Sequence, residues 1–175
     1  MIRDLTPRGA VVFETAAGTG AISLAIADKA ASVLCTDLSK RMLKIARRKA
    51  ERSGAGNIRF DTRSLFDTGE PDGTYDVVIA SQILHLIDEP EKAAAELKRI
   101  SRGLVIVPVG LLKDLRGFFI RPTMGIFRML GFAPKREFDA DGYRRFLTEI
   151  GLPPSRFAII DGHIPMAVAV WTVGV

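Results

Sequence analysis

Cysteine and histidine are scarce in this sequence, which has one Cys and two His among 175 residues. A single cysteine, Cys35, excludes an internal disulfide and fits a reducing cytosol. It lies in an apolar run, where a small buried hydrophobe is its commonest role. The two histidines, His85 and His163, lie far apart in the sequence, and no motif for metal ligation is present. We therefore predict no metal site.

Long apolar runs are missing as well. No run approaches the roughly 18 apolar residues that a membrane-spanning helix requires, and residues 1–7 contain no apolar core of a signal peptide. These absences predict a soluble, cytoplasmic protein. The sequence also has no internal repeat and no low-complexity linker, so residues 1–175 are expected to form a single domain.

Acidic residues are almost missing from one segment, and the net charge of +5 gathers there. Between residues 39 and 53 the single acid is Glu51. The basic residues of this segment are Lys40, Arg41, Lys44, Arg47, Arg48, Lys49 and Arg52. Apolar residues recur there at helical spacing, which predicts an amphipathic surface helix. Such a charged face is most often simply solvated, and contact with an anion or with an anionic membrane surface is the alternative.

Short apolar runs alternate with helical patterns along the chain. The predicted strands are residues 10–13, 32–36, 57–60, 75–80, 103–107, 157–160 and 167–173. The alternation is typical of an α/β protein whose parallel sheet has helices on both faces. The last two runs follow each other without a helix between them, which predicts an antiparallel finish.

Polar and glycine residues mark the ends of the predicted helices. Ser39 is expected to cap the basic helix, and Gly54 to close it. Asp88, with Glu91 three positions on, is expected to open a helix over residues 89–100. A last helix is expected to stop at Gly151.

The segment 14–20, Glu-Thr-Ala-Ala-Gly-Thr-Gly, directly follows the first apolar run. A glycine turn between a strand and a helix presents free backbone N–H groups to a ligand, and Gly18 and Gly20 permit a close approach. Asp37 ends the second apolar run, where an acid can accept hydrogen bonds from a ribose diol. Together these features predict a site for a nucleoside cofactor.

The order of these motifs resembles that of the class I S-adenosylmethionine-dependent methyltransferases of small-molecule type, most strongly over residues 10–107. The resemblance implies S-adenosylmethionine as the cofactor and S-adenosylhomocysteine as its product. It also implies a Rossmann-like fold with a mostly parallel, seven-stranded sheet whose last strand is reversed. Residues 1–175 would then be one cofactor-binding domain.

The same resemblance assigns cofactor contacts to four segments. The loop after the first strand would hold the methionine part, and the acid after the second strand would hold the ribose, with hydrophobes flanking the adenine. The motif Tyr75 to Ser81, followed by Leu84-His85-Leu86, would lie beneath the cofactor. The residues assigned to the cofactor are Glu14, Ala16, Gly18, Thr19, Gly20, Asp37, Leu38, Met42, Ser64, Leu65, Ser81 and Gln82.

Two positions depart from the family pattern. Ser64 stands where relatives commonly have an Asp that binds the adenine amino group, so adenine recognition is expected to depend more on the backbone N–H of Leu65. The usual Lys-Pro-Gly-Gly turn before the fifth strand is shortened to Ser101-Arg102-Gly103. Ser64 keeps open a non-catalytic, cofactor-binding module as an alternative function.

The acceptor side is expected within residues 108–140, because ligands bind where strands of an open α/β sheet end. The stretch 111–132 is rich in apolar residues and is interrupted by Arg116, Arg121 and Arg128. It predicts an insertion or lid over a small, apolar or amphiphilic acceptor; core packing or an oligomer contact is the alternative. His85 is the candidate base that takes a proton from the acceptor, and a histidine packed at a corner is its alternative.

Two other enzyme classes fit less well. A nicotinamide-dependent oxidoreductase would have a third glycine where Ser23 stands. An RNA or other nucleic-acid methyltransferase fits the basic charge. The amino-group modifiers of that class, however, carry a paired-proline motif where this chain has Ser81-Gln82-Ile83-Leu84. A small-molecule acceptor is therefore predicted, and nucleic acid is the less favoured partner.

Overall fold

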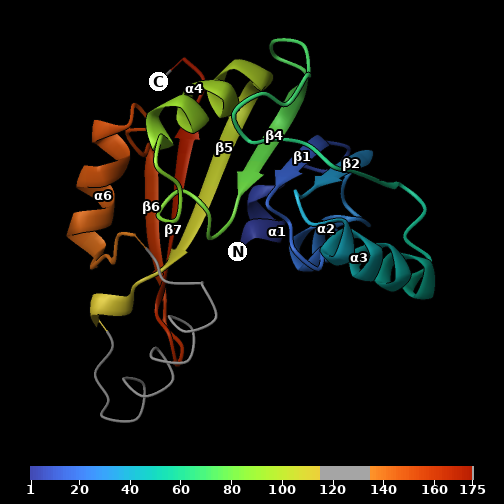
Figure 1. The fold of residues 1–175 in the computed structure, drawn as a ribbon, viewed down its shortest axis with the longest axis horizontal. Coiled ribbons are helices and arrows are strands. Elements are labelled where there is room, and N and C mark those ends of the chain that lie inside the picture. Colours follow the sequence, from blue (N-terminus) through green and yellow to red (C-terminus); the bar gives the residue numbers. More distant parts are fainter. Residues whose placement is uncertain (115–134, 175) are drawn as a thin grey trace.

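The computed structural model describes residues 1–114 and 135–174, which form one seven-stranded sheet in the order β3-β2-β1-β4-β5-β7-β6 (Figure 1). The strands are β1 (Val11–Thr15), β2 (Ser32–Thr36), β3 (Ile58–Asp61), β4 (Tyr75–Ala80), β5 (Ser101–Gly110), β6 (Arg156–Ile160) and β7 (Met166–Thr172). The helices are α1 (Ile2–Leu5), α2 (Ala21–Ile26), α3 (Lys40–Ser53), α4 (Pro90–Ile100), the 3₁₀ turn η1 (Leu112–Asp114) and α6 (Ala140–Glu149).

The sheet is parallel from β3 to β5 and antiparallel in its last two pairings. Strand β7 lies between β5 and β6 and runs opposite to both. A helix connects β1 to β2, β2 to β3 and β4 to β5, as parallel neighbours require a crossover. The predicted Rossmann-like sheet with a reversed last strand is therefore confirmed.

Two apolar cores lie on opposite faces of the sheet because successive strand residues point to opposite sides. Val12 belongs to the core that contains residues of α2 and α3, whereas its neighbour Phe13 belongs to the core beneath α4 and α6. Figure 1 accordingly shows α1, α2 and α3 together on one side and α4 and α6 on the other. The prediction of helices on both faces is confirmed.

The caps of α3 were predicted correctly, but the cap of α4 was not. Ser39 Oγ accepts a hydrogen bond from the Met42 N–H at 3.3 Å, and Gly54 ends the helix with a left-handed φ of 71°. Helix α4 instead begins at Pro90, preceded by a residue with no side-chain cap. The Asp88 carboxylate pairs with Lys135, a partner distant in the sequence.

The expected turn before β5 is also wrong, because Ser101 to Gly103 are already part of the strand. The pairing of β4 and β5 shifts register between Tyr75 and Val77, opposite this segment. A Cβ on Gly103 would lie 2.4 Å from the Asp76 carbonyl oxygen. Glycine is needed here because two backbones approach closely, as is common at a bulge.

The predicted insertion 108–140 is described only at its ends. Residues 108–114 complete β5 and form η1, and residues 135–139 lead into α6. The run 115–132 lies outside the described residues, so the lid stays a prediction. Within the described ranges, each helix is too short or too polar to cross a lipid bilayer.

Candidate functional site

A cleft of about 480 Å³ lies at the carboxyl ends of β1, β2 and β4. Strand β1 has β2 on one side and β4 on the other, so the order of the strands reverses at this point. Ligands of open α/β sheets bind at such a switch point. The cleft is lined by Thr15, Ala16, Gly18, Asp37, Leu38, Ser39, Met42, Arg63, Ser64, Leu65, Phe66, Ser81, Gln82, Ile83, Leu86 and Ile87.

Glu14 anchors the loop after β1 from below the cleft. Its side chain is buried, and it accepts hydrogen bonds from the Ser23 backbone N–H at 2.8 Å and from the Ser23 hydroxyl. Burial raises the pKa of Glu14 to about 7. Ser23, which stands where a dinucleotide fold has its third glycine, thus ties the start of α2 to the end of β1.

The two glycines of this loop have different reasons to be glycine. Both have a left-handed backbone, with φ of 55° at Gly18 and 72° at Gly20. A Cβ on Gly18 would meet nothing within 4 Å, and Gly18 lines the cleft. A Cβ on Gly20 would lie 2.9 Å from Ala46 Cβ, so Gly20 lets α2 pack closely on α3.

Asp37 connects the first two loops. One carboxylate oxygen accepts a hydrogen bond from the Gly18 N–H at 2.8 Å, and the other accepts one from the Ser39 N–H at 2.8 Å. A carboxylate has about four acceptor positions, so each oxygen keeps one for a ligand. Because Asp37 also lines the cleft, it can hold the loop and bind a diol at once.

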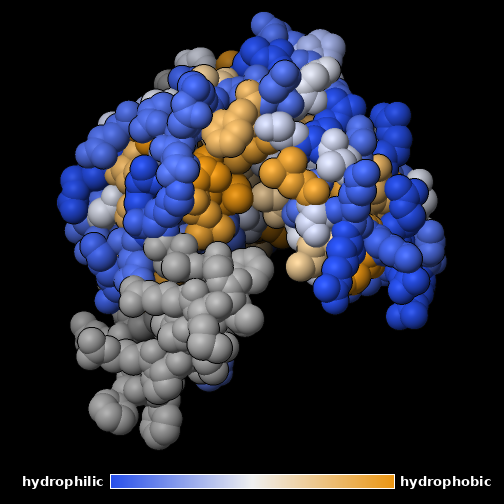
Figure 2. All heavy atoms as spheres, viewed as in Figure 1, coloured by the Kyte–Doolittle hydropathy of each residue, from blue (hydrophilic) through white to orange (hydrophobic). Residues whose placement is uncertain are grey.

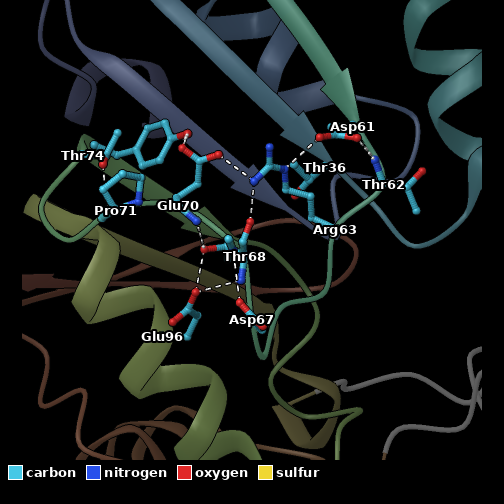
Figure 3. Close-up of polar contacts among 12 residues, drawn as sticks. Thr36, Asp61, Thr62, Arg63, Asp67, Thr68, Glu70, Pro71, Thr74 and Glu96 are labelled. Atoms are coloured by element: carbon cyan, nitrogen blue, oxygen red, sulfur yellow. Dashed lines mark hydrogen bonds and ion pairs between the residues drawn. The ribbon is translucent and has the colours of Figure 1, made fainter.

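The loop after β3 forms a further wall, and Arg63 is its centre (Figure 3). The Arg63 guanidinium pairs with Asp61 at 2.9 Å and Glu70 at 2.7 Å and donates to the Thr68 carbonyl oxygen at 2.5 Å. Figure 3 also shows Glu96 reaching from α4 to Thr68. Four charged side chains thus fix the loop that carries Ser64 and Leu65.

Ser64 and Leu65 themselves lie in the cleft wall. Ser64 Oγ accepts a hydrogen bond from the Phe66 N–H at 3.1 Å, and its second lone pair can accept one from an adenine amino group. Leu65 is buried at 7% exposure, and its N–H has no partner among the described residues. Both groups are therefore available for the adenine contacts that the sequence predicts.

The segment after β4 is held against the end of β5. Gln82 has a left-handed φ of 56°, and its side-chain oxygen accepts a hydrogen bond from the Gly110 N–H at 3.1 Å. His85 is half-buried and lies outside the cleft lining. Its Nδ1 is buried without a partner among the described residues, and burial lowers the pKa of the imidazole. The neutral form is thus the one present near pH 7.

The structure brings nine of the twelve predicted cofactor residues to the cleft. These are Ala16, Gly18, Asp37, Leu38, Met42, Ser64, Leu65, Ser81 and Gln82. Glu14 and Gly20 act from behind the wall, and the Thr19 hydroxyl accepts a hydrogen bond from Lys49 Nζ at 2.9 Å. Seven further lining residues were not among the predicted site residues: Thr15, Ser39, Arg63, Phe66, Ile83, Leu86 and Ile87. The position of Arg63 and Phe66 after the third parallel strand is a usable signal.

Comparison with known families decides among the cofactor classes that such a cleft could serve. A family model described as "Methyltransferase domain" matches residues 12–103, which contain every predicted cofactor residue. The chain belongs to the class I S-adenosylmethionine-dependent methyltransferases. S-adenosylmethionine, the expected cofactor, is thereby confirmed.

Individual relatives of this methyltransferase domain support the same family. A phosphatidylethanolamine N-methyltransferase of Cereibacter sphaeroides is 34% identical over 113 residues, which cover 61% of this chain and 54% of that protein. A demethylmenaquinone methyltransferase of Renibacterium salmoninarum is 35% identical over 120 residues, covering 69% and 46%. The chain therefore spans about half the length of the curated relatives it matches.

The fold of the methyltransferase domain is also found among solved structures. A crystal structure of a SAM-dependent methyltransferase from Aquifex aeolicus matches with a TM-score of 0.75 and 18% identity. The match covers 97% of this chain and 87% of that one. At this identity the likeness shows a shared fold, and the cofactor assignment comes from the family match.

Proposed function

We propose that this domain transfers a methyl group from S-adenosylmethionine to a small, apolar or amphiphilic acceptor. The observation that carries the proposal is the division of the cleft into two chemical parts. Asp37 and Gly18 come from the loops after β2 and β1 and supply polar groups, and we call their part of the lining the polar end. Ile83, Leu86 and Ile87 come from the segment after β4, on the other side of β1, and we call their part the apolar end. A cleft of about 480 Å³ falls within the roughly 300 to 1,000 Å³ of small-molecule sites.

The polar end suits the cofactor. Asp37 has free acceptor positions for the ribose hydroxyls, and Met42 and Leu65 offer apolar faces for the adenine. The absence of contacts around Gly18 leaves room for a ligand against the main chain. When bound, S-adenosylmethionine supplies a sulfonium-linked methyl group, which needs an acceptor lone pair held close and in line.

The apolar end suits the acceptor. Ile83, Leu86 and Ile87 can orient an apolar molecule and exclude water, which are the main requirements of a displacement that needs no obligatory base. A neutral His85 beside this segment is proposed to take the proton of a hydroxyl acceptor. The relatives named for phosphatidylethanolamine and demethylmenaquinone, both amphiphiles, support this substrate class.

Calorimetry with S-adenosylhomocysteine tests the cofactor end. Asp37→Ala should bind about 10- to 100-fold more weakly, because a hydrogen bond to a charged group contributes roughly 1.5–3 kcal/mol. Asp141→Ala, an exposed acid in the first turn of α6, is the matched control and should bind normally. Equal affinities for the two variants would contradict the role of Asp37.

Transfer of a labelled methyl group tests the acceptor end. Demethylmenaquinone in its reduced, hydroquinone form, phosphatidylethanolamine and RNA are offered separately, and the proposal expects label in one of the two lipids. Label in RNA alone would support the nucleic-acid alternative, and cofactor binding without transfer would support a non-catalytic module. His85→Ala should slow transfer to an acceptor that must lose a proton and remove the acidic limb of the pH–rate profile, while cofactor affinity stays unchanged.

A further inference from the structure

Helix α3 presents an uncompensated basic face. It runs over 14 residues, and its seven basic side chains are all exposed. None of the seven pairs with a carboxylate among the described residues. Arg47 lies over the Phe60 ring, and Lys49 donates to the Thr19 hydroxyl. The other five are Lys40, Arg41, Lys44, Arg48 and Arg52.

Much of this charge pattern opposes the stability of the helix, although Arg52 in the last turn favours it. Lys40 and Lys44 are four residues apart, as are Lys44 and Arg48, and like charges at this spacing repel. The first turn of α3 contains no acid, so Lys40 and Arg41 also oppose the positive end of the helix dipole. These repulsions lower the stability of the isolated domain. A large anionic partner would relieve them, so the basic face is suited to such a partner.

Apolar side chains lie at the same end of the helix. Leu38, directly before the N-cap residue of α3, is 72% exposed, and Phe66 from the loop after β3 is 43% exposed. Both line the cleft. Figure 2 shows a hydrophilic surface over α3 beside apolar atoms that gather around the indentation in the middle of the molecule. The basic helix thus begins beside exposed hydrophobes that line the cleft.

We propose that the basic face of α3, together with Leu38 and Phe66, docks on an anionic lipid bilayer. Exposed aliphatic and aromatic side chains next to a row of cations are the combination that binds the interface of such a membrane. Because Leu38 and Phe66 also line the cleft, docking in this way would place that edge of the cleft at the lipid. The proposal rests on the proposed function in one respect, that the acceptor is an amphiphile held in the membrane.

Sedimentation with vesicles tests the docking surface without cofactor or acceptor. The full chain should bind vesicles that contain phosphatidylserine, bind pure phosphatidylcholine vesicles far more weakly, and dissociate as salt is added. The variant carrying Lys44→Gln, Arg48→Gln and Arg52→Gln should bind on the order of 100-fold more weakly, since each cation contributes about fivefold near an anionic surface. These three side chains are exposed and make no hydrogen bond or ion pair with the described residues.

A variant of equal charge serves as the control. Arg8→Gln, Arg145→Gln and Arg156→Gln remove three exposed cations outside α3 and should keep most of the vesicle binding. Equal loss in the two triple variants, or no loss in the α3 variant, would overturn the proposal. Binding to RNA but not to vesicles would also overturn it and assign the face to nucleic acid. Vesicle binding without any methyl transfer would refute the proposed function and leave the docking surface intact.

Leu38→Glu tests the apolar part of the surface. It should lower binding to phosphatidylserine vesicles at salt concentrations that already screen much of the electrostatic attraction. Val173→Glu serves as the control because Val173 is an exposed apolar residue that lies distant from α3. Unchanged binding of the Leu38 variant would show that the attraction is purely electrostatic and would overturn the inclusion of Leu38.

Discussion

The loop after β1 and the loop after β3 both border the cleft, yet each depends on a buried glutamate in different surroundings. Among the described residues, the donors to Glu14 are the Ser23 N–H and hydroxyl alone, and burial raises the pKa of Glu14 to about 7. Glu96, which holds the second loop through Thr68, also accepts hydrogen bonds from Arg99, and its pKa falls to about 2. Within residues 1–114 and 135–174, Glu14 thus has no cationic partner, whereas Glu96 has Arg99.

The difference shows how the two walls of the cleft respond to their environment. The second loop is held by ionised groups throughout the physiological pH range, since Glu96 stays charged. The first loop is held by a carboxyl group that titrates near neutrality, and its backbone is left-handed at Ala16, Gly18 and Gly20. We infer that the first loop is the strained, pH-sensitive wall, and the second is the rigid one.

The largest expected effect comes from removing the charge that holds the second loop. Glu96→Ala should lower the free energy of unfolding by about 3 to 4 kcal/mol, because it leaves the buried Thr68 N–H and hydroxyl without an acceptor. Urea denaturation measures the loss. Glu91→Ala, an exposed position in the first turn of the same helix, should change stability by less than about 1 kcal/mol. Similar losses in both variants would show that the network around Thr68 does not hold the loop.

The second prediction concerns pH and the first loop. The pKa of Glu14 is about 7 in the folded chain against a reference value of 4.5, so the folded state binds more protons between these values. Protonated Glu14 therefore makes its full contribution to the free energy of unfolding below about pH 4.5. This contribution is lost as the pH rises through 7. The loss should reach on the order of 3 kcal/mol, since one pKa unit corresponds to about 1.4 kcal/mol.

Glu14→Gln isolates this effect from other titrating groups. Glutamine keeps a neutral oxygen that accepts from Ser23 but cannot ionise. The unfolding free energy of the wild type minus that of the variant should therefore fall as the pH rises from 4.5 to above 7. A difference that stays constant over this range would mean that Glu14 is ionised throughout.

The sequence predicts the framework of both walls because the responsible interactions are local. Apolar runs give the strands, and Ser39 caps α3 through a contact three residues away. The glycines of the first loop follow from a backbone that must turn sharply between a strand and a helix. Asp37 was recognisable because the ends of adjacent parallel strands meet at one edge of the sheet.

Features that depend on distant partners could not be predicted. Asp88 has the spacing of a helix cap, but Lys135 competes for its carboxylate. Gly103 resembles a turn residue, and only the approach of the Asp76 carbonyl shows that it belongs to a bulge. Arg63 has no motif of its own, since its partners in the loop become visible only when the loop folds back on it.

The third prediction separates the two glycines of the first loop. Gly20→Ala should destabilise the fold by about 2 kcal/mol, because a left-handed alanine is strained and its Cβ would lie 2.9 Å from Ala46 Cβ. Gly18→Ala has the strain without the clash and should cost about 1 kcal/mol, while its Cβ weakens S-adenosylhomocysteine binding. Thermal unfolding and calorimetry measure the two effects. Equal stability losses and equal affinities would mean that the glycines share one role.

The smallest expected effect tests whether the first loop stores strain at Ala16. This residue has a φ of 50°, which costs a non-glycine residue about 1 kcal/mol. Ala16→Gly relieves that cost but gives the unfolded chain more freedom, so its unfolding free energy should change by less than about 0.5 kcal/mol. Ala17→Gly has no such strain to relieve, because Ala17 is not among the left-handed residues, and should lose about 1 kcal/mol. If chemical denaturation gave equal losses for the two variants, the backbone at Ala16 would be unstrained, and the contrast between the two loops would rest on the different surroundings of Glu14 and Glu96.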